Sequence, residues 1–155
     1  VFASYKNDRW GVKGRFTYAQ NAAHLSMISG YGVTNIDANG EQEYGTLNSV
    51  GGWVDVTYKQ PLKKGFLTFC CFAGYTKNLG CQDDIVGPIY MRGEKNMDNM
   101  WRIAPSVLYT HNAMSFGIEY NPTTVAYGTA DSRYKVKDTH NVTNHRICAM
   151  MKYNF

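Results

Sequence analysis

The sequence predicts an all-β fold of antiparallel strands, and three observations lead to that prediction. Polar and apolar residues alternate along most of the chain, whereas the spacing of an amphipathic helix is almost absent. Short connections alternate with long ones between the alternating segments. Charged residues make up only 18% of the 155 residues and aromatic residues 14%, which argues against disorder and coiled coil. The longest apolar stretch, 67–75, is far shorter than a membrane-spanning helix requires.

Seven segments carry the period-two pattern of a strand. In chain order they are 1–6, 10–20, 50–60, 66–77, 100–110, 114–120 and 143–155. The segment 10–20 is typical, because its two faces read Trp10, Val12, Gly14, Phe16, Tyr18 and Gly11, Lys13, Arg15, Thr17, Ala19. The segments 1–6 and 66–77 alternate less cleanly. Pro105 and Pro122 interrupt the pattern, since each removes a ladder hydrogen bond, and we expect a bulge at Pro105.

The connections between these segments fall into two classes. The short ones are 7–8, 61–65 and 111–113, and the long ones are about 21–46, 78–99 and 129–140. Strict alternation places every short turn at one end of the strands and every long loop at the other. Outer-membrane barrels have this asymmetry, with long loops on the extracellular side. The expected strands also have the roughly 9–11 residues that a tilted strand needs to cross a bilayer.

Aromatic residues support the same interpretation, because membrane barrels carry aromatic girdles at both interfaces. On the apolar face, those near the short turns are Trp10, Tyr58, Tyr109, Tyr153 and Phe155, and those near the long loops are Tyr18, Tyr75 and Trp101. Val, Ile, Ala and Met lie between the two groups. The sequence therefore predicts an antiparallel transmembrane up-and-down β-barrel, with residues 1–155 in a single domain.

The odd number of strands adds one expectation. Bacterial single-chain barrels have an even number of strands and begin on the periplasmic side, so we expect at least one strand before Val1. The seven strands would then be the C-terminal part of a larger barrel. No signal peptide is visible at the N-terminus.

The end of the chain resembles the C-terminal strand of Gram-negative outer-membrane proteins. A terminal Phe155 follows Tyr153, Met151, Ala149 and Ile147 at alternate positions. The resemblance implies a porin-like protein of the bacterial outer membrane, whose assembly signal at Phe155 is read by the barrel-assembly machinery. It also implies contact with outer-membrane lipid and lipopolysaccharide, and a homotrimer. The stretch 72–80 is similar to porin-like proteins of the Bacteroidota.

A porin-like barrel would turn its polar face to a water-filled lumen. The charged residues predicted to line the pore are Lys13, Arg15, Asp55, Lys59, Arg102, Glu119, Arg146 and Lys152. The six cations outnumber the two anions, which predicts passive diffusion of small hydrophilic, anionic solutes. Alternatively, these charges pair across strands or only solvate a wall.

The long segment 21–46 contains an apolar stretch that suggests a constriction of the pore. Porin-like resemblance implies that such a loop folds inward, with Met27 or Tyr31 as the constriction candidates. The alternatives are that the loop packs against a neighbouring subunit, or that it extends a strand above the membrane.

Nothing in the sequence indicates an enzyme, a cofactor, a metal site or a nucleic-acid partner. The four cysteines form no CxxC pair, and the four histidines form no ligand cluster. Two other functions stay open. One is a structural or loop-presenting barrel with a blocked lumen, in which Trp53, Phe72, Leu108 and Met150 contact a plug. The other is a soluble lipocalin-like carrier whose apolar face points inward.

Overall fold

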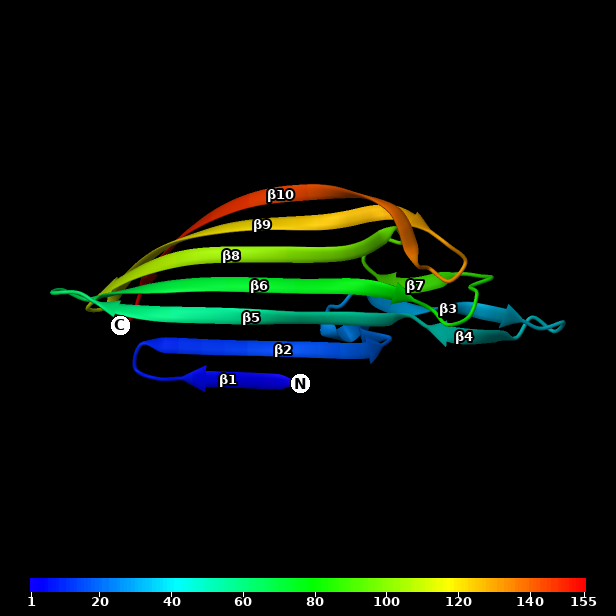
Figure 1. The fold of residues 1–155 in the computed structure, drawn as a ribbon, viewed down its shortest axis with the longest axis horizontal. Helices are drawn as coiled ribbons and strands as arrows, with labels where there is room; N and C mark the ends of the chain where they lie inside the picture. Colours follow the sequence, from blue (N-terminus) through cyan, green and yellow to red (C-terminus); the bar gives the residue numbers. More distant parts are fainter.

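The computed structural model describes all 155 residues and contains two antiparallel sheets (Figure 1). The large sheet has seven strands, and every strand pairs with the preceding and following strand of that sheet in chain order. These strands are β1 (Phe2–Lys6), β2 (Trp10–Gln20), β5 (Asn48–Pro61), β6 (Phe66–Gly80), β8 (Met97–His111), β9 (Met114–Ala130) and β10 (Val136–Tyr153). They correspond to the seven predicted segments, so the all-β antiparallel prediction is confirmed.

A small second sheet lies at one end of the large one (Figure 1). Its order is β4 (Gln42–Thr46), β3 (Ser29–Ile36), β7 (Ile89–Arg92), and a short 3-10 helix, η1 (Ala22–Leu25), precedes it. We call this part, residues 21–46 and 81–96, the cap. The cap occupies most of the two segments that were expected to be long loops.

The third expected long loop, 129–140, is mostly strand. β9 continues to Ala130 and β10 begins at Val136, so the connection is a turn of 131–135. The second half of β9 is rich in β-branched residues and tyrosine, which favour strands even where polar residues occupy both faces. The strict alternation of short and long connections therefore ends before the last hairpin.

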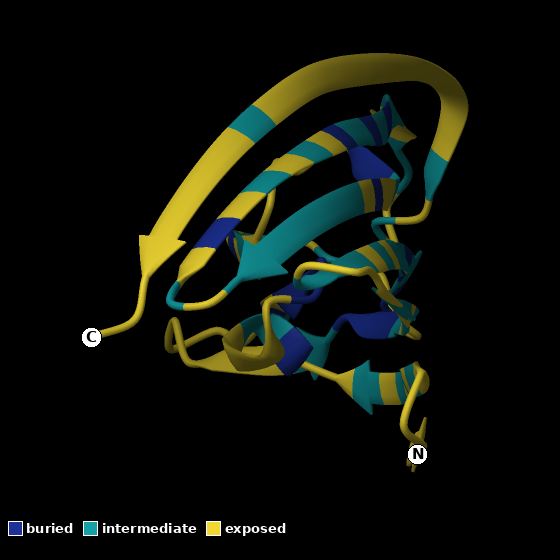
Figure 2. Ribbon diagram, turned by 90° about the vertical axis from the view of Figure 1, so that its left-hand side faces the viewer, coloured by how far each residue is buried: buried dark blue, intermediate teal, exposed yellow.

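The large sheet is open. β1 and β10 are its edges, and each pairs on one side only, so the seven strands form no closed barrel. The sheet is nevertheless strongly curved, and β10 arches over the other strands (Figure 2). The closed barrel that the sequence predicts is therefore not found in this structure.

Both prolines of the interrupted segments lie in one gap of the β8–β9 ladder. Pairing runs to Arg102↔Thr123 and resumes at Ser106↔Glu119, with Pro105 and Pro122 on the unpaired stretches between. The register is the same on both sides of the gap, so the bulge expected at Pro105 is absent. Because proline has no N–H to donate, placing both prolines in one gap confines the lost hydrogen bonds to one place.

The buried core lies almost entirely at the cap end. Leu47, Cys81 and Ile89 form its centre, with Ile85 and Tyr134 packed against them. Gly80 allows a close approach of the β9–β10 turn: its φ is +76°, and a Cβ there would lie 2.6 Å from the carbonyl oxygen of Arg133. The amide of Cys81 donates to that same oxygen at 2.7 Å. The cap and the last hairpin are thus joined.

Candidate functional site

All eight charged residues predicted to line a pore lie on one face of the large sheet. Side chains directly opposite one another in paired strands share a face, and alternate residues of a strand share a face. The pairings Lys13↔Asp55, Arg15↔Trp53, Trp53↔Gly74, Gly74↔Arg102 and Glu119↔Cys148 link the strands in this way. We call this side the polar face, and the side that carries Trp10, Phe16, Tyr75 and Ile118 the apolar face.

The polar face keeps most of its excess positive charge. Arg146 lies 3.9 Å from Glu119, and this is the single ion pair between the predicted pore-lining residues. Arg15 and Arg102 have no carboxylate partner. Their Nε groups donate to threonine hydroxyls, Arg15 to Thr17 at 3.0 Å and Arg102 to Thr123 at 2.8 Å. The remaining guanidinium N–H groups of both arginines are left for other partners.

A cavity of about 230 Å³ lies on the polar face between the sheet and the end of η1. Its lining includes the two unpaired arginines, the aromatic pair Trp53 and Phe72, and Met27 from the cap. Trp53 and Phe72 have ring centroids 6.2 Å apart with planes inclined by 29°. Charge and aromatic surface therefore meet within one small cavity.

Glycine makes room for the cap on this face. A Cβ on Gly51 would lie 3.2 Å from Cε of Met27 and 3.3 Å from Oγ1 of Thr76. Met27 is buried and packs directly over the sheet at this point. Of the two constriction candidates, Met27 thus lies against the polar face.

The other constriction candidate, Tyr31, lies elsewhere. It belongs to β3, where its ring stacks on Tyr90 at a centroid distance of 5.3 Å and meets Tyr44 edge-on at 5.7 Å. Tyr31 pairs with Thr46 and Tyr90 in the small sheet, so strand pairing in the cap holds it. This pairing joins residues far apart in sequence, which local reading of 21–46 did not reveal.

The apolar face is broadly exposed. Its large side chains with more than a third of their surface accessible include Trp10, Phe16, Tyr18, Phe69, Tyr75, Trp101, Ile103, Phe116, Ile118, Tyr120, Ile147, Met151 and Tyr153. A contiguous apolar surface of this extent indicates contact with lipid or with another protein. No helix in the structure has the length and apolar character needed to cross a membrane.

Aromatic rings on the apolar face form two groups at different heights. Trp10 pairs with Tyr58 near the short turns, with ring centroids 4.6 Å apart. Tyr75 pairs with Trp101 near the cap, in the same row as Phe16. On β2 the two rows are marked by Trp10 and Phe16, which are six residues apart, or about 20 Å along the strand. Of the other predicted girdle residues, Tyr109, Tyr153 and Phe155 lie toward the short turns and Tyr18 toward the cap.

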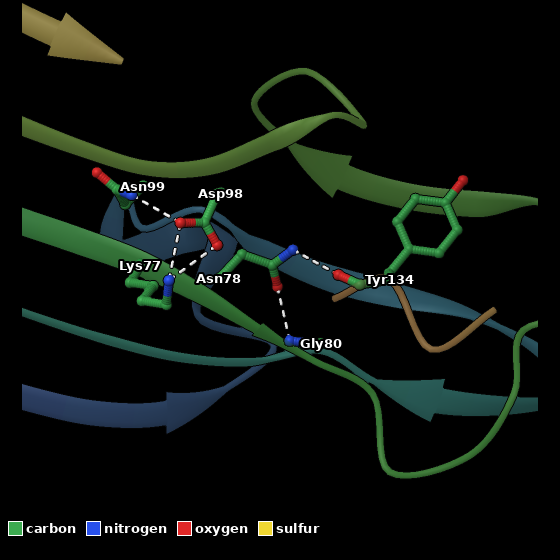
Figure 3. A network of polar contacts seen from close by, with 6 residues as sticks. All are labelled: Lys77, Asn78, Gly80, Asp98, Asn99 and Tyr134. Atoms are coloured by element: carbon green, nitrogen blue, oxygen red, sulfur yellow. Dashed lines mark hydrogen bonds and ion pairs between the residues drawn. The ribbon is translucent and has the colours of Figure 1, made fainter. Parts of the chain in front are cut away.

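A polar junction ties β6 to β8 and to the turn between β9 and β10 (Figure 3). Lys77 Nζ lies 2.7 Å and 2.9 Å from the two carboxylate oxygens of Asp98, and Asn99 donates to the same carboxylate at 2.6 Å. Asn78 donates to the carbonyl oxygen of Tyr134 at 2.8 Å and accepts from the amide of Gly80. Every group in the junction has a partner, so it fixes geometry rather than offering a binding site.

Two exposed carboxyls accept hydrogen bonds at this end of the sheet. Hydrogen bonds from Ser132 and then Arg133 lower the pKa of Asp84, whose ordinary value is 3.8. The backbone amide of Lys135, followed by the side chain of Lys137, lowers the pKa of Asp131 in the same way. Both aspartates are therefore ionised at neutral pH; Asp84 accepts hydrogen bonds across the contact between cap and turn, and Asp131 accepts them within the last hairpin.

Other chemistry has little support in the structure. No three His, Cys, Asp or Glu side chains are grouped so that they could hold a metal ion. All four cysteines are free; Cys81 is buried, and the adjacent Cys70 and Cys71 lie on opposite faces. The sequence interpretation missed Thr76, and it named Trp53 and Phe72 only in the blocked-lumen alternative, as contacts of a plug. Both are large aromatic residues at positions where the alternation predicts polar ones, and this was the sequence signal for the cavity.

Comparison with known proteins adds no relative. No family model, no curated protein and no solved structure matches the chain.

Proposed function

We propose that the chain forms part of the wall of a porin-like β-barrel channel in a bacterial outer membrane, which passes small hydrophilic anions by diffusion. The observation that carries the proposal is the opposite character of the two faces of one curved sheet. One face is apolar and exposed, and the other bears cations that lack carboxylate partners.

The apolar face is more stable in contact with lipid than in contact with water. Burying apolar surface contributes about 25 cal/mol per Å² removed from water. The aromatic rings lie at two levels of the apolar face, as do the two girdles that flank the apolar band of membrane barrels. A lipocalin-like carrier would need this face turned inward and covered, and that reading has less support because side chains such as Ile147 and Met151 are 71% and 70% exposed.

The polar face can be solvated by water, and the positive charge of this face favours anions. Arg15 and Arg102 stand in one row across the sheet, Lys13 lies one same-face position from Arg15 on β2, and Lys59 lies six residues along β5 from Trp53 of that row. Rows of cations in a confined aqueous path raise the local concentration of anions and lower the barrier to their passage. The pairing of Glu119 with Arg146 removes one of the two acidic groups from that balance.

The free edges of β1 and β10 make further strands part of the proposal. Unpaired backbone groups are not tolerated in lipid, so other strands must pair with both edges and close the sheet. The terminal pattern ending at Phe155 supports recognition by the barrel-assembly machinery, and the porin-like resemblance suggests a homotrimer in contact with lipopolysaccharide.

A second candidate function rests on the position of the cap. Met27 covers the polar face and sits near Trp53 and Phe72, so the cap would narrow or block the path. Under this alternative the barrel presents its cap outside the cell and conducts nothing.

Single-channel conductance in planar bilayers under a salt gradient tests the proposal. The variants are Arg15→Glu and Arg102→Glu, and Lys63→Glu in the turn between β5 and β6 makes the same charge change away from the polar face. Stepwise conductance with an anion-favouring reversal potential is expected, weakened in the first two variants and unchanged in the third. Folded protein that conducts nothing would refute the channel and favour the second candidate.

A further inference from the structure

We propose that the cavity on the polar face is a binding site for a small aromatic carboxylate. As a step on the path of a permeating solute, this inference rests on the proposed function. The binding chemistry itself depends only on the cavity and its side chains.

The two arginines are placed to hold the carboxylate. Arg15, Trp53, Gly74 and Arg102 form one row across β2, β5, β6 and β8. The two arginine Cα atoms are therefore three strand spacings apart, about 14 Å, and both side chains line the cavity. The ring of Phe72 lies over Gly74 in the middle of the row, since a Cβ on Gly74 would be 2.8 Å from Phe72 Cζ. A guanidinium binds a carboxylate through two parallel hydrogen bonds, and neither arginine already has an acidic partner.

An aromatic ring fits between the arginines. The wall there consists of Trp53 and Phe72, and Met27 and Met100 also line the cavity. Offset aromatic stacking and sulfur–aromatic contact both favour a flat ring over a hydrated inorganic anion. A dry cavity of about 150 Å³ already holds benzene. The 230 Å³ here leaves room for one ring with a carboxylate, but not for a large solute.

A buried hydroxyl provides an independent sign of a missing ligand. Thr76 is only 9% exposed, and its Oγ1 is the one buried side-chain polar atom in the structure without a hydrogen-bond partner. Thr76 lines the cavity beside Gly51 and Met27. An unsatisfied buried polar group is costly. A ligand that displaces the side chains covering this hydroxyl and accepts its hydrogen bond would remove that cost.

Equilibrium dialysis of labelled benzoate against the folded protein in detergent tests the site. Acetate is the comparison without a ring, and benzamide is the comparison without a charge. Benzoate is expected to bind at least about tenfold more tightly than either one, since both the ring and the charge contribute. If acetate binds as tightly as benzoate, the cavity only attracts anions and the inference is wrong.

Variants separate the site from general electrostatics. Arg15→Gln and Arg102→Gln should each weaken benzoate binding by about tenfold, and Thr76→Val by about fivefold. Lys63→Gln makes the same charge change in the turn between β5 and β6, away from the polar face, and should leave binding unchanged. Equal loss in Lys63→Gln and Arg15→Gln would overturn the inference. Circular dichroism verifies that each variant is folded.

The outcome is independent of the channel measurement. Benzoate binding without conductance would refute the channel and keep the site. Anion-selective conductance without benzoate binding would keep the channel and refute the site. In a conducting protein, benzoate should also lower the chloride current, and the Arg15→Gln variant should lose that effect.

Discussion

Replacing Lys77 with methionine should expose the energetic role of the ion pair between β6 and β8. The carboxylate of Asp98 is 8% exposed, and Lys77 Nζ contacts it at 2.7 Å while the lysine side chain itself is 38% exposed. In Lys77→Met the carboxylate keeps its hydrogen bond from Asn99 but loses its charge partner. A buried charge is then left uncompensated.

The expected loss lies between two limits. Breaking a fully buried ion pair costs about 3–5 kcal/mol, whereas an exposed pair contributes about 0–1 kcal/mol. Because the carboxylate is buried and the lysine is partly exposed, we expect Lys77→Met to lower the free energy of unfolding by about 2 kcal/mol. The double variant Lys77→Met/Asp98→Asn should lose less than Lys77→Met alone, since no charge remains buried.

Urea unfolding of the protein folded in lipid vesicles, followed by tryptophan fluorescence, measures these losses. Lys137→Met is the matched control, because its ion pair with Asp131 is 67% and 31% exposed and should contribute at most about 1 kcal/mol. A loss in Lys77→Met no larger than that of the control would refute the reasoning. It would also be refuted if the double variant lost the sum of the losses measured for Lys77→Met and for Asp98→Asn separately.

Three further outcomes follow from the structure. Gly80→Ala should cost more than Gly40→Ala in the same unfolding assay, because both glycines have positive φ but only Gly80 faces a carbonyl oxygen, and equal costs would remove the contact with the turn as the cause. The folded pKa of Asp84 lies below its ordinary 3.8, so its stabilising effect is complete above that pH and is lost as pH falls through the lower folded pKa. The protection factor for hydrogen exchange at the Ile85 amide, which donates to the carbonyl oxygen of Ser132, should fall over that range, and Asp84→Asn should remove the change. In lipid-inserted protein, a membrane-impermeant maleimide should label Cys70 on the polar face and leave Cys71 on the apolar face unmodified, and labelling of both would contradict lipid contact.

The strands of the large sheet were predictable because their signal is local. Residues 10–20 alternate cleanly, and β2 has those same bounds. The extension of β9 beyond Tyr120 was missed, because Asn121, Thr123 and Thr124 place polar groups on both faces and resemble a loop in sequence. Pairing with β8 and β10 on either side holds this stretch in the sheet. Tertiary context therefore outweighed the weak local pattern.

The cap and the cavity required information that local sequence lacks. β3 pairs with β7, about sixty residues later, and Gly30 permits that pairing because a Cβ there would lie 2.1 Å from the carbonyl oxygen of Tyr90. The sequence shows only a glycine at this position. The faces of Arg15 and Arg102 followed from alternation alone, but the approach of Met27 and Thr76 to Gly51 depends on how the cap folds over the sheet.

The position of the buried core bears on the order in which the chain folds. Leu47 immediately precedes β5, and Cys81 immediately follows β6. The two strands are joined by a four-residue turn at one end, and core packing holds their other ends together. In the large sheet, β5 and β6 are the pair of strands whose ends away from their turn are held together by a core that excludes water. We therefore expect this hairpin to form early, with β2 and β8 assembling on either side of it before the outer strands find their partners.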